Sequence, residues 1–160
     1  MSIMSTSNKT TKRLRKPKPG EFIQIELPNG RYAYGRALAS PMVAFYDVIS
    51  PAPVGIEDLN NAKVLFIIWV MNYSFKKLTW NIIGHADLPS SLNKRVWFGK
   101  KDSISGELTK YSSWNGESTE RRVTKKEFDA LERAAVWGPL HVEDRLICHH
   151  EGTECKWLKD

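Results

Sequence analysis

The residues best suited to chemistry form the run Cys148-His149-His150-x4-Cys155. Thiolates and imidazoles are zinc ligands, and a cysteine beside a base is a candidate nucleophile. Zinc sites usually space their ligands in two separated pairs, whereas these four residues crowd the end of an expected helix. Neighbouring helical side chains point about 100° apart, so Cys148 and His149 do not make a dyad. We expect free thiols, exposed histidines, no metal and no catalytic residue.

Paired acidic residues give no stronger signal for catalysis. Glu57-Asp58 falls in a predicted turn, and Glu143-Asp144-Arg145 lies in a predicted helix, where we expect a solvated ionic face. His85 is expected as a packed or surface histidine. The sequence contains no Walker loop, no dinucleotide fingerprint and no Gly-x-Ser-x-Gly elbow. We therefore predict that the protein is not an enzyme and uses no cofactor.

Aromatic residues point towards binding. Most of the six tryptophans and five tyrosines are expected in the core. Tyr111 and Trp114 lie in the polar segment 99–118, where they are hard to bury, between the charged residues Lys110 and Glu117. Exposed aromatic residues with charged neighbours are typical of protein interfaces. Aromatic strands beside Arg31 and Arg36 leave nucleic-acid binding open as an alternative.

The N-terminal part of the chain is predicted to be mostly strand. Residues 21–27 alternate between apolar and polar, and Pro28-Asn29-Gly30 marks a tight hairpin turn before a second strand. Ser50-Pro51-Ala52-Pro53 excludes a central strand, and a short helical turn is expected at 56–61. The predicted strands are 21–27, 31–39, 42–49, 63–73 and 79–88.

The second half contains a polar excursion followed by helices. Residues 96–98 are predicted as a short strand that closes an edge, and 99–118 as a surface segment around a strand at 108–114. Thr124 and Glu127 match a capping box, and Phe128, Leu131 and Ala135 then fall on one helical face.

Gly138-Pro139 should end that helix and start another, with Val142, Leu146 and His149 inward and Gly152 as its stop. The predicted fold class is α+β: a β-rich single domain with a mostly antiparallel, strongly bent sheet or partly open barrel and two short C-terminal helices.

The charge of the chain is concentrated near its start. Residues 1–20 contain six of the 24 basic residues and no acidic one, which leaves 18 basic residues to balance 18 acidic ones. We predict a flexible basic leader at 1–18 and one domain at 19–160. No apolar run approaches the ~20 residues of a membrane span, and two cysteines indicate no disulfide framework. A cytoplasmic, non-membrane protein is expected.

Three blocks, in this order, resemble the immunity protein 26 family of bacterial polymorphic-toxin systems. They are PGEFIQIELPNGRYAYGR (19–36) with AFYD (44–47), WNIIG (80–84) with LP (88–89), and LERAAVWGPLHVEDRL (131–146).

The resemblance implies a small, β-rich, cytoplasmic protein, encoded beside a toxin, that binds the toxin domain and blocks it. It supplies no catalytic residue. Its pattern residues are interpreted as turn formers and core members: Gly30, Tyr32, Tyr34, Gly35, Arg36, Trp80, Gly84, Trp137 and Arg145.

The functional prediction is therefore non-catalytic occlusion of a toxin domain encoded by a neighbouring gene. The segment 99–118 is the predicted contact region, with Tyr111, Trp114, Glu117 and Lys110 as partner-binding candidates. Nucleic-acid binding through the leader and the aromatic strands is the alternative, and the neutral charge of residues 21–160 disfavours it.

Overall fold

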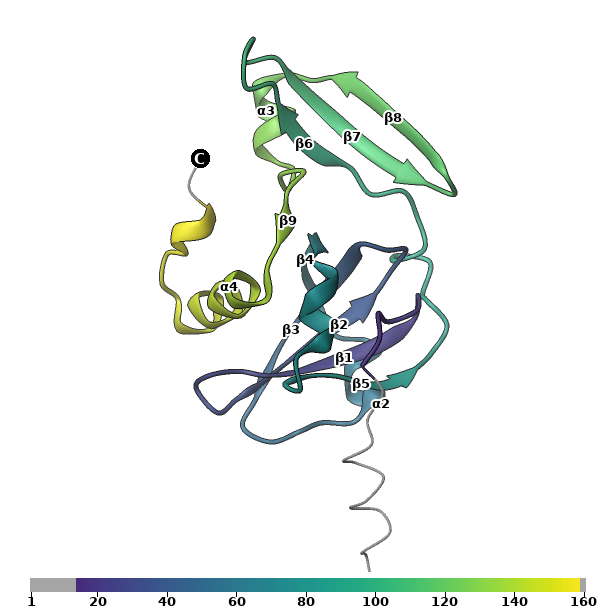
Figure 1. The fold of residues 1–160 in the computed structure, drawn as a ribbon, viewed down its shortest axis with the longest axis vertical. Coiled ribbons are helices and arrows are strands. Elements are labelled where there is room, and N and C mark those ends of the chain that lie inside the picture. The colour runs from purple at the N-terminus through teal and green to yellow at the C-terminus, as the bar shows by residue number, and fades with distance from the viewer. Residues whose placement is uncertain (1–13, 159–160) are drawn as a thin grey trace, which may run out of the picture.

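The computed structural model describes residues 14–158, and a β-meander begins the fold (Figure 1). Strands β1 (Glu21–Glu26), β2 (Tyr32–Ala37) and β3 (Met42–Ser50) pair antiparallel in sequence order. Gly30 has φ +82° in the first hairpin, where the Asn29 side chain accepts a hydrogen bond from the Arg31 N–H. The predicted strands and turn are confirmed. The predicted leader at 1–18 lies largely outside the described residues.

The main sheet has six strands in the order β5-β1-β2-β3-β4-β9. Strand β4 (Val64–Val70) pairs antiparallel with β3 and parallel with the two-residue strand β9 (Val136–Trp137). Strand β5 (Trp80–His85) pairs antiparallel with β1, along the edge of β1 that does not pair with β2. Strands β1 to β4 pair with their neighbours in sequence, and only β5 pairs antiparallel with a distant strand. The strands of this sheet could therefore be predicted well from hydrophobic alternation.

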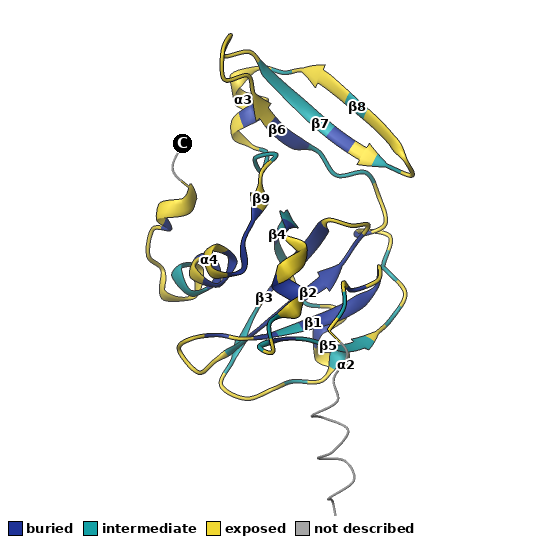
Figure 2. Ribbon diagram, in the orientation of Figure 1, coloured by how far each residue is buried: buried dark blue, intermediate teal, exposed yellow. Residues whose placement is uncertain are grey.

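The strands of the main sheet are largely buried (Figure 2), because apolar side chains pack on both faces. On one face, helix α4 (Pro139–Glu151) contributes Val142 and Leu146, and the 3-10 helix η1 (Asn72–Lys76) contributes Phe75. On the other face, helix α2 (Ile56–Leu59) buries Leu59 beside Tyr34 and other aromatic residues. The main sheet is thus covered on both faces.

A second sheet of three strands stands beside the main one (Figure 1). Strands β6 (Phe98–Lys101), β7 (Leu108–Trp114) and β8 (Glu117–Arg122) pair antiparallel. The strand predicted at 108–114 is confirmed, but the one predicted at 96–98 is shifted and closes no edge of the main sheet. Strand β8 was not predicted, because its sequence ESTERR is polar on both faces. The β-rich, mostly antiparallel α+β class is confirmed, and neither sheet closes into a barrel.

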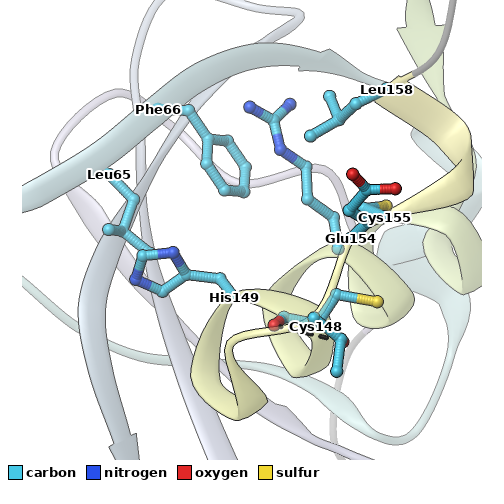
Figure 3. Close-up of a pocket in the computed structure, with 9 residues that line it drawn as sticks. Leu65, Phe66, Cys148, His149, Glu154, Cys155 and Leu158 are labelled. Carbon is cyan, nitrogen blue, oxygen red and sulfur yellow. Dashed lines mark hydrogen bonds between the residues drawn. The ribbon is translucent and has the colours of Figure 1, made fainter.

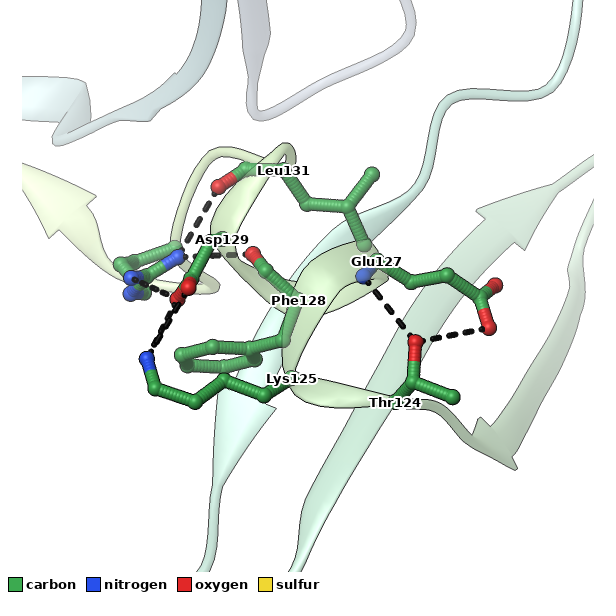
Figure 4. A network of polar contacts seen from close by, with 7 residues as sticks. Thr124, Lys125, Glu127, Phe128, Asp129 and Leu131 are labelled. Atoms are coloured by element: carbon green, nitrogen blue, oxygen red, sulfur yellow. Dashed lines mark hydrogen bonds and ion pairs between the residues drawn. The ribbon is translucent and has the colours of Figure 1, made fainter.

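Helix α3 (Lys125–Asp129) is shorter than predicted (Figure 4). The capping box is present, since Thr124 Oγ1 accepts a hydrogen bond from the Glu127 N–H at 3.2 Å. The helix nevertheless ends before Leu131 and Ala135. Backbone pairing takes over there: Gly99 N–H donates to Glu132 O at 2.7 Å and Ala134 N–H donates to Gly99 O at 2.8 Å. Arg133 donates to two carbonyl oxygens at the helix end.

Helix α4 begins at Pro139 and ends at Gly152, which has φ +74°, as predicted. His149 was predicted either to face inward or to be among the exposed histidines of the helix end; it is exposed and lies 3.3 Å from an Asp47 carboxylate oxygen. The predicted solvated ionic face is wrong for two residues. Glu143 is 3% exposed and accepts a hydrogen bond from Trp80 Nε1 at 2.8 Å, while buried Arg145 pairs with Glu132 at 3.0 Å.

Helices within the described residues are all too short or too polar to cross a membrane.

Candidate partner-binding surface

The β6-β7-β8 sheet contains all four predicted contact residues. Strands β7 and β8 are joined by a tight turn at Asn115 and Gly116, which have φ +51° and +81°. Two consecutive positive φ values are the requirement of a type I′ hairpin turn, which asparagine followed by glycine satisfies at little cost. The turn places Trp114 directly opposite Glu117.

Tyr111 lies on the face of this sheet that is directed at the main sheet. The pairing of Phe98 with Tyr111 puts both rings on one face, where Trp69 of β4 contacts them at centroid distances of 5.0 and 5.9 Å. The Tyr111 hydroxyl is 3.1 Å from the Ser118 hydroxyl. Tyr111 is therefore half-buried and takes part in joining the two sheets.

Lys110, Trp114 and Glu117 lie on the opposite face. Alternation along β7 separates Lys110 and Trp114 from Tyr111, and the cross-strand pair brings Glu117 to the same side as Trp114. Trp114 is half-buried and Glu117 is exposed. The structure thus brings three of the four predicted residues to one face and places the fourth on the other.

The centre of that outer face is Trp97, which was not predicted as a contact residue. Lys110 Nζ lies 4.5 Å from the Trp97 ring centroid, and the guanidinium carbons of Arg95 and Arg121 lie 5.7 and 5.8 Å from it. We call this group, Arg95, Trp97, Lys110 and Arg121, the Trp97 cluster. The Asn115-Gly116 pair directly after the β7 segment is typical of a hairpin turn. It was the sequence signal that could have revealed the next strand, β8, and with it Arg121.

Apart from Glu117, the acidic residues of this sheet and its turns lie away from the Trp97 cluster. On the inner face, Glu120 accepts hydrogen bonds from Thr109 at 2.7 Å and Lys100 at 3.3 Å, and these bonds lower its pKa. In the β6–β7 turn, the N–H groups of Ser105 and Ile104 donate to Asp102 and lower its pKa. The carboxylates thus stabilise the turn and the inner face.

One protein family matches the β-meander and the next three strands, β4, β5 and β6. The model of the immunity protein 26 family matches residues 18–109, which is more than half of the chain. The chain belongs to this family. No curated protein and no solved structure matches it. The match supports an immunity function and ends within β7, so Arg95 and Trp97 lie inside the matched residues, whereas Lys110, Trp114, Glu117 and Arg121 lie beyond them.

Several family pattern residues of this immunity protein have structural roles. Arg36 is fully buried and donates hydrogen bonds to Gly20 O at 2.9 Å and to Ala86 O at 2.7 Å. Trp80 is buried and donates its indole N–H to Glu143. Trp137 is buried in β9, at the start of α4 rather than between two packed helices. These side chains hold the scaffold together.

Three members of the cysteine and histidine run, Cys148, His149 and Cys155, line a pocket of about 510 Å³ between α4 and β4, and His150 does not. Figure 3 shows the thiol of Cys148 and the ring of His149 pointing to opposite sides of α4. Cys148 and Cys155 are free thiols. Among residues 14–158, no group of three or more His, Cys, Asp or Glu side chains could hold a metal ion.

Proposed function

We propose that this protein confers immunity by binding a toxin domain and occluding it, without chemistry of its own. The outer face of the β6-β7-β8 sheet is the proposed contact surface. The observation that supports this most is the Trp97 cluster: an aromatic ring and three cations gathered on a face directed away from the main core. Tryptophan and arginine are the residues most enriched among interface hot spots.

The size of the sheet indicates how far the contact extends. A seven-residue strand such as β7 is about 24 Å long and three strands are about 14 Å wide, or roughly 340 Å². A stable interface covers about 800 Å² on each partner. The proposed contact therefore reaches beyond the sheet, onto the Asn115-Gly116 turn and the exposed side of α3.

Co-expression with the toxin domain encoded next to this gene, followed by size-exclusion chromatography, tests the proposal. We expect the cells to survive and the two proteins to elute together. Survival without any complex would contradict occlusion by binding. Cell death with both proteins soluble would contradict the choice of this toxin domain as the partner.

Alanine variants test the contact residues. Trp114→Ala, on the proposed contact surface, should raise the Kd for the toxin domain at least 30-fold, equivalent to about 2 kcal/mol. Trp157→Ala is the control, since Trp157 is an exposed tryptophan in η2 (Lys156–Leu158), where it stacks on His141. Tyr111→Ala should change the Kd less, because Tyr111 lies on the inner face and contacts Trp69. Unchanged affinity in the folded Trp114→Ala variant would remove Trp114 from the interface.

A further inference from the structure

The three cations of the Trp97 cluster have no acidic partner among the described residues. Arg95, Lys110 and Arg121 form no ion pair there, although other cations of the same sheet do. Lys110 and Arg121 are also directly opposite each other in the β7–β8 register. Like charges in opposed positions destabilise a sheet. The free protein therefore keeps a repulsive arrangement that folding alone does not require.

Neighbouring carboxylates are engaged away from the cluster. Glu107 accepts two hydrogen bonds from Arg122, the nearer at 2.8 Å, on the inner face. On α3, Asp129 pairs with Lys125 at 2.9 Å, and the Glu127 side chain lies 3.4 Å from the Thr124 hydroxyl (Figure 4). Glu117 lies on the outer face but at the hairpin end, opposite Trp114 and four residues from Arg121.

One buried polar atom within the cluster and one beside it also lack hydrogen-bond partners. Arg95 Nη1 and Ser112 Oγ are both inaccessible to solvent and make no hydrogen bond. Ser112 is completely buried and shares its face of β7 with Lys110, two residues away. Buried polar groups are nearly always paired, and an unpaired one in a native protein needs a specific explanation. Because neither atom is accessible to solvent, both belong to the packing beneath the cations, and it is the unpaired charges of Lys110 and Arg121 that indicate a partner.

We propose that the Trp97 cluster receives carboxylate side chains of the toxin domain, so that an acidic surface of the toxin pairs with Arg95, Lys110 and Arg121. This inference rests on the proposed function and adds the chemistry of the partner. Arginine pairs with carboxylates through two parallel hydrogen bonds, and lysine contributes a further charge. The partner's negative charge would remove the repulsion between Lys110 and Arg121.

The arrangement favours a protein surface over a nucleic acid. Single-stranded nucleic acids bind to free aromatic faces on which bases stack. The Trp97 ring is half-buried and already has three cations within 6 Å of its centroid. A compact group of carboxylates on a protein surface can pair with the three cations without access to the face of the Trp97 ring.

Two adjacent arginines of β8 provide a matched test. Arg121 belongs to the cluster, whereas Arg122 faces the other side, is 81% exposed and pairs with Glu107. The Kd of the full-length protein for the toxin domain is measured between 50 and 500 mM NaCl. We expect Arg121→Gln to raise the Kd at least tenfold and to weaken its salt dependence. Arg122→Gln should change the Kd less than threefold. Equal effects of the two variants would overturn the proposal.

A second variant separates recognition from folding. Lys110→Met removes the charge, and the double variant with Arg121→Gln should lose more than 50-fold in affinity. The thermal midpoint of each free variant should stay equal to that of the wild type or rise, because a repulsion is removed. A lower midpoint would show that the cations stabilise the fold, and unchanged toxin affinity would show that they do not bind the toxin. Either result contradicts the proposal.

The remaining outcomes concern the partner. A complete absence of complex with the wild-type protein would overturn the proposed function. It would also overturn the proposal that the toxin domain binds to this face. Binding of a 30-nucleotide single-stranded DNA that Arg121→Gln abolishes and Arg122→Gln does not would assign the cluster to nucleic acid instead. We expect no such binding at 150 mM NaCl.

Discussion

Arg36 connects several segments through one buried side chain. Its guanidinium donates to Gly20 O, Ala86 O, Asp87 O and the Tyr46 hydroxyl, at 2.7 to 3.1 Å. It also lies over the ring of Phe22, 3.9 Å from the centroid. A lysine keeps the charge but has one nitrogen and cannot reproduce this planar set of donors.

We predict that Arg36→Lys lowers the free energy of unfolding by about 3 kcal/mol, since buried donors and acceptors lose partners. Urea denaturation measures the change. Arg31→Lys is the control, because Arg31 is exposed in the first hairpin, and its effect should stay below about 0.5 kcal/mol. A loss of less than 1 kcal/mol for Arg36→Lys would show that the four acceptors contribute little.

Glu21 makes the free energy of unfolding depend on pH in the acidic range. Arg15 donates two hydrogen bonds of 2.8 Å to its carboxylate, and this pairing lowers the pKa of Glu21 to about 2. A lowered pKa adds stability above the unfolded value near 4.5, and the gain disappears as the pH falls through 2. Glu21→Gln should thus cost about 1–2 kcal/mol at pH 7, after allowance for solvent around Arg15, and progressively less towards pH 2. Urea denaturation of both proteins across this range checks the prediction, which a constant difference would contradict.

Residue types alone did not reveal which charges are buried. Glu143 and Arg145 are next to exposed Asp144, and a helix with Glu, Asp and Arg in sequence is typical of a solvated surface. Their partners, Trp80 and Glu132, come from a strand 63 residues away and a loop 13 residues away. Local sequence carries no information about such contacts, so the buried role of Glu143 could not be predicted.

Among the elements, the second sheet was only partly predictable. The alternation of β7 and the capping box of α3 are local signals, and both are confirmed. Strand β8 carries charge on both faces, as exposed edge strands often do because charge prevents association between edges. Helix α3 stops early because residues 132–134 pair with Gly99, and such long-range pairing overrides helical periodicity.

Because α3 has only five residues, its cap should contribute strongly to its stability. Thr124→Ala removes the acceptor of the Glu127 N–H and should cost about 1 kcal/mol. Thr124→Ser retains the hydroxyl and should cost only a few tenths of that. Chemical denaturation compares the two variants with the wild type. A serine variant as unstable as the alanine variant would mean that the methyl group matters more than the hydrogen bond.

At the scale of the molecule, Trp69 joins the two sheets. It belongs to β4 and contacts Phe98 of β6 and Tyr111 of β7. Phe98 is 2% exposed and packs in a cluster with Leu38, Met42 and Ala44 of the main sheet. Trp69 and the cluster around Phe98 therefore hold the β6-β7-β8 sheet against the main sheet.

Trp69→Ala should cost about 3 kcal/mol and should loosen the second sheet more than the first. Hydrogen exchange followed by mass spectrometry is the measurement. Amides of β6 and β7 should exchange at least tenfold faster, while those of β1 and β2 change less. Ile147→Ala, in the partly buried margin of the main core, is the control and should not show this difference. Uniform acceleration over both sheets would mean that they unfold as one unit.

The segment that leads into the second sheet and the segment that leads out of it lie side by side. Gly99 lies beside Arg133, joined through hydrogen bonds to Glu132 and Ala134. The 34 residues between Gly99 and Ala134 thus form a closed excursion with a short stem. Because loop-closure entropy changes slowly with length, such an excursion can be lengthened, shortened or exchanged at little cost to the main sheet. This architecture lets Lys110 and Arg121 be exchanged with one continuous segment, while Arg95 and Trp97 stay with the scaffold. We predict that grafting the segment between relatives alters the choice of partner.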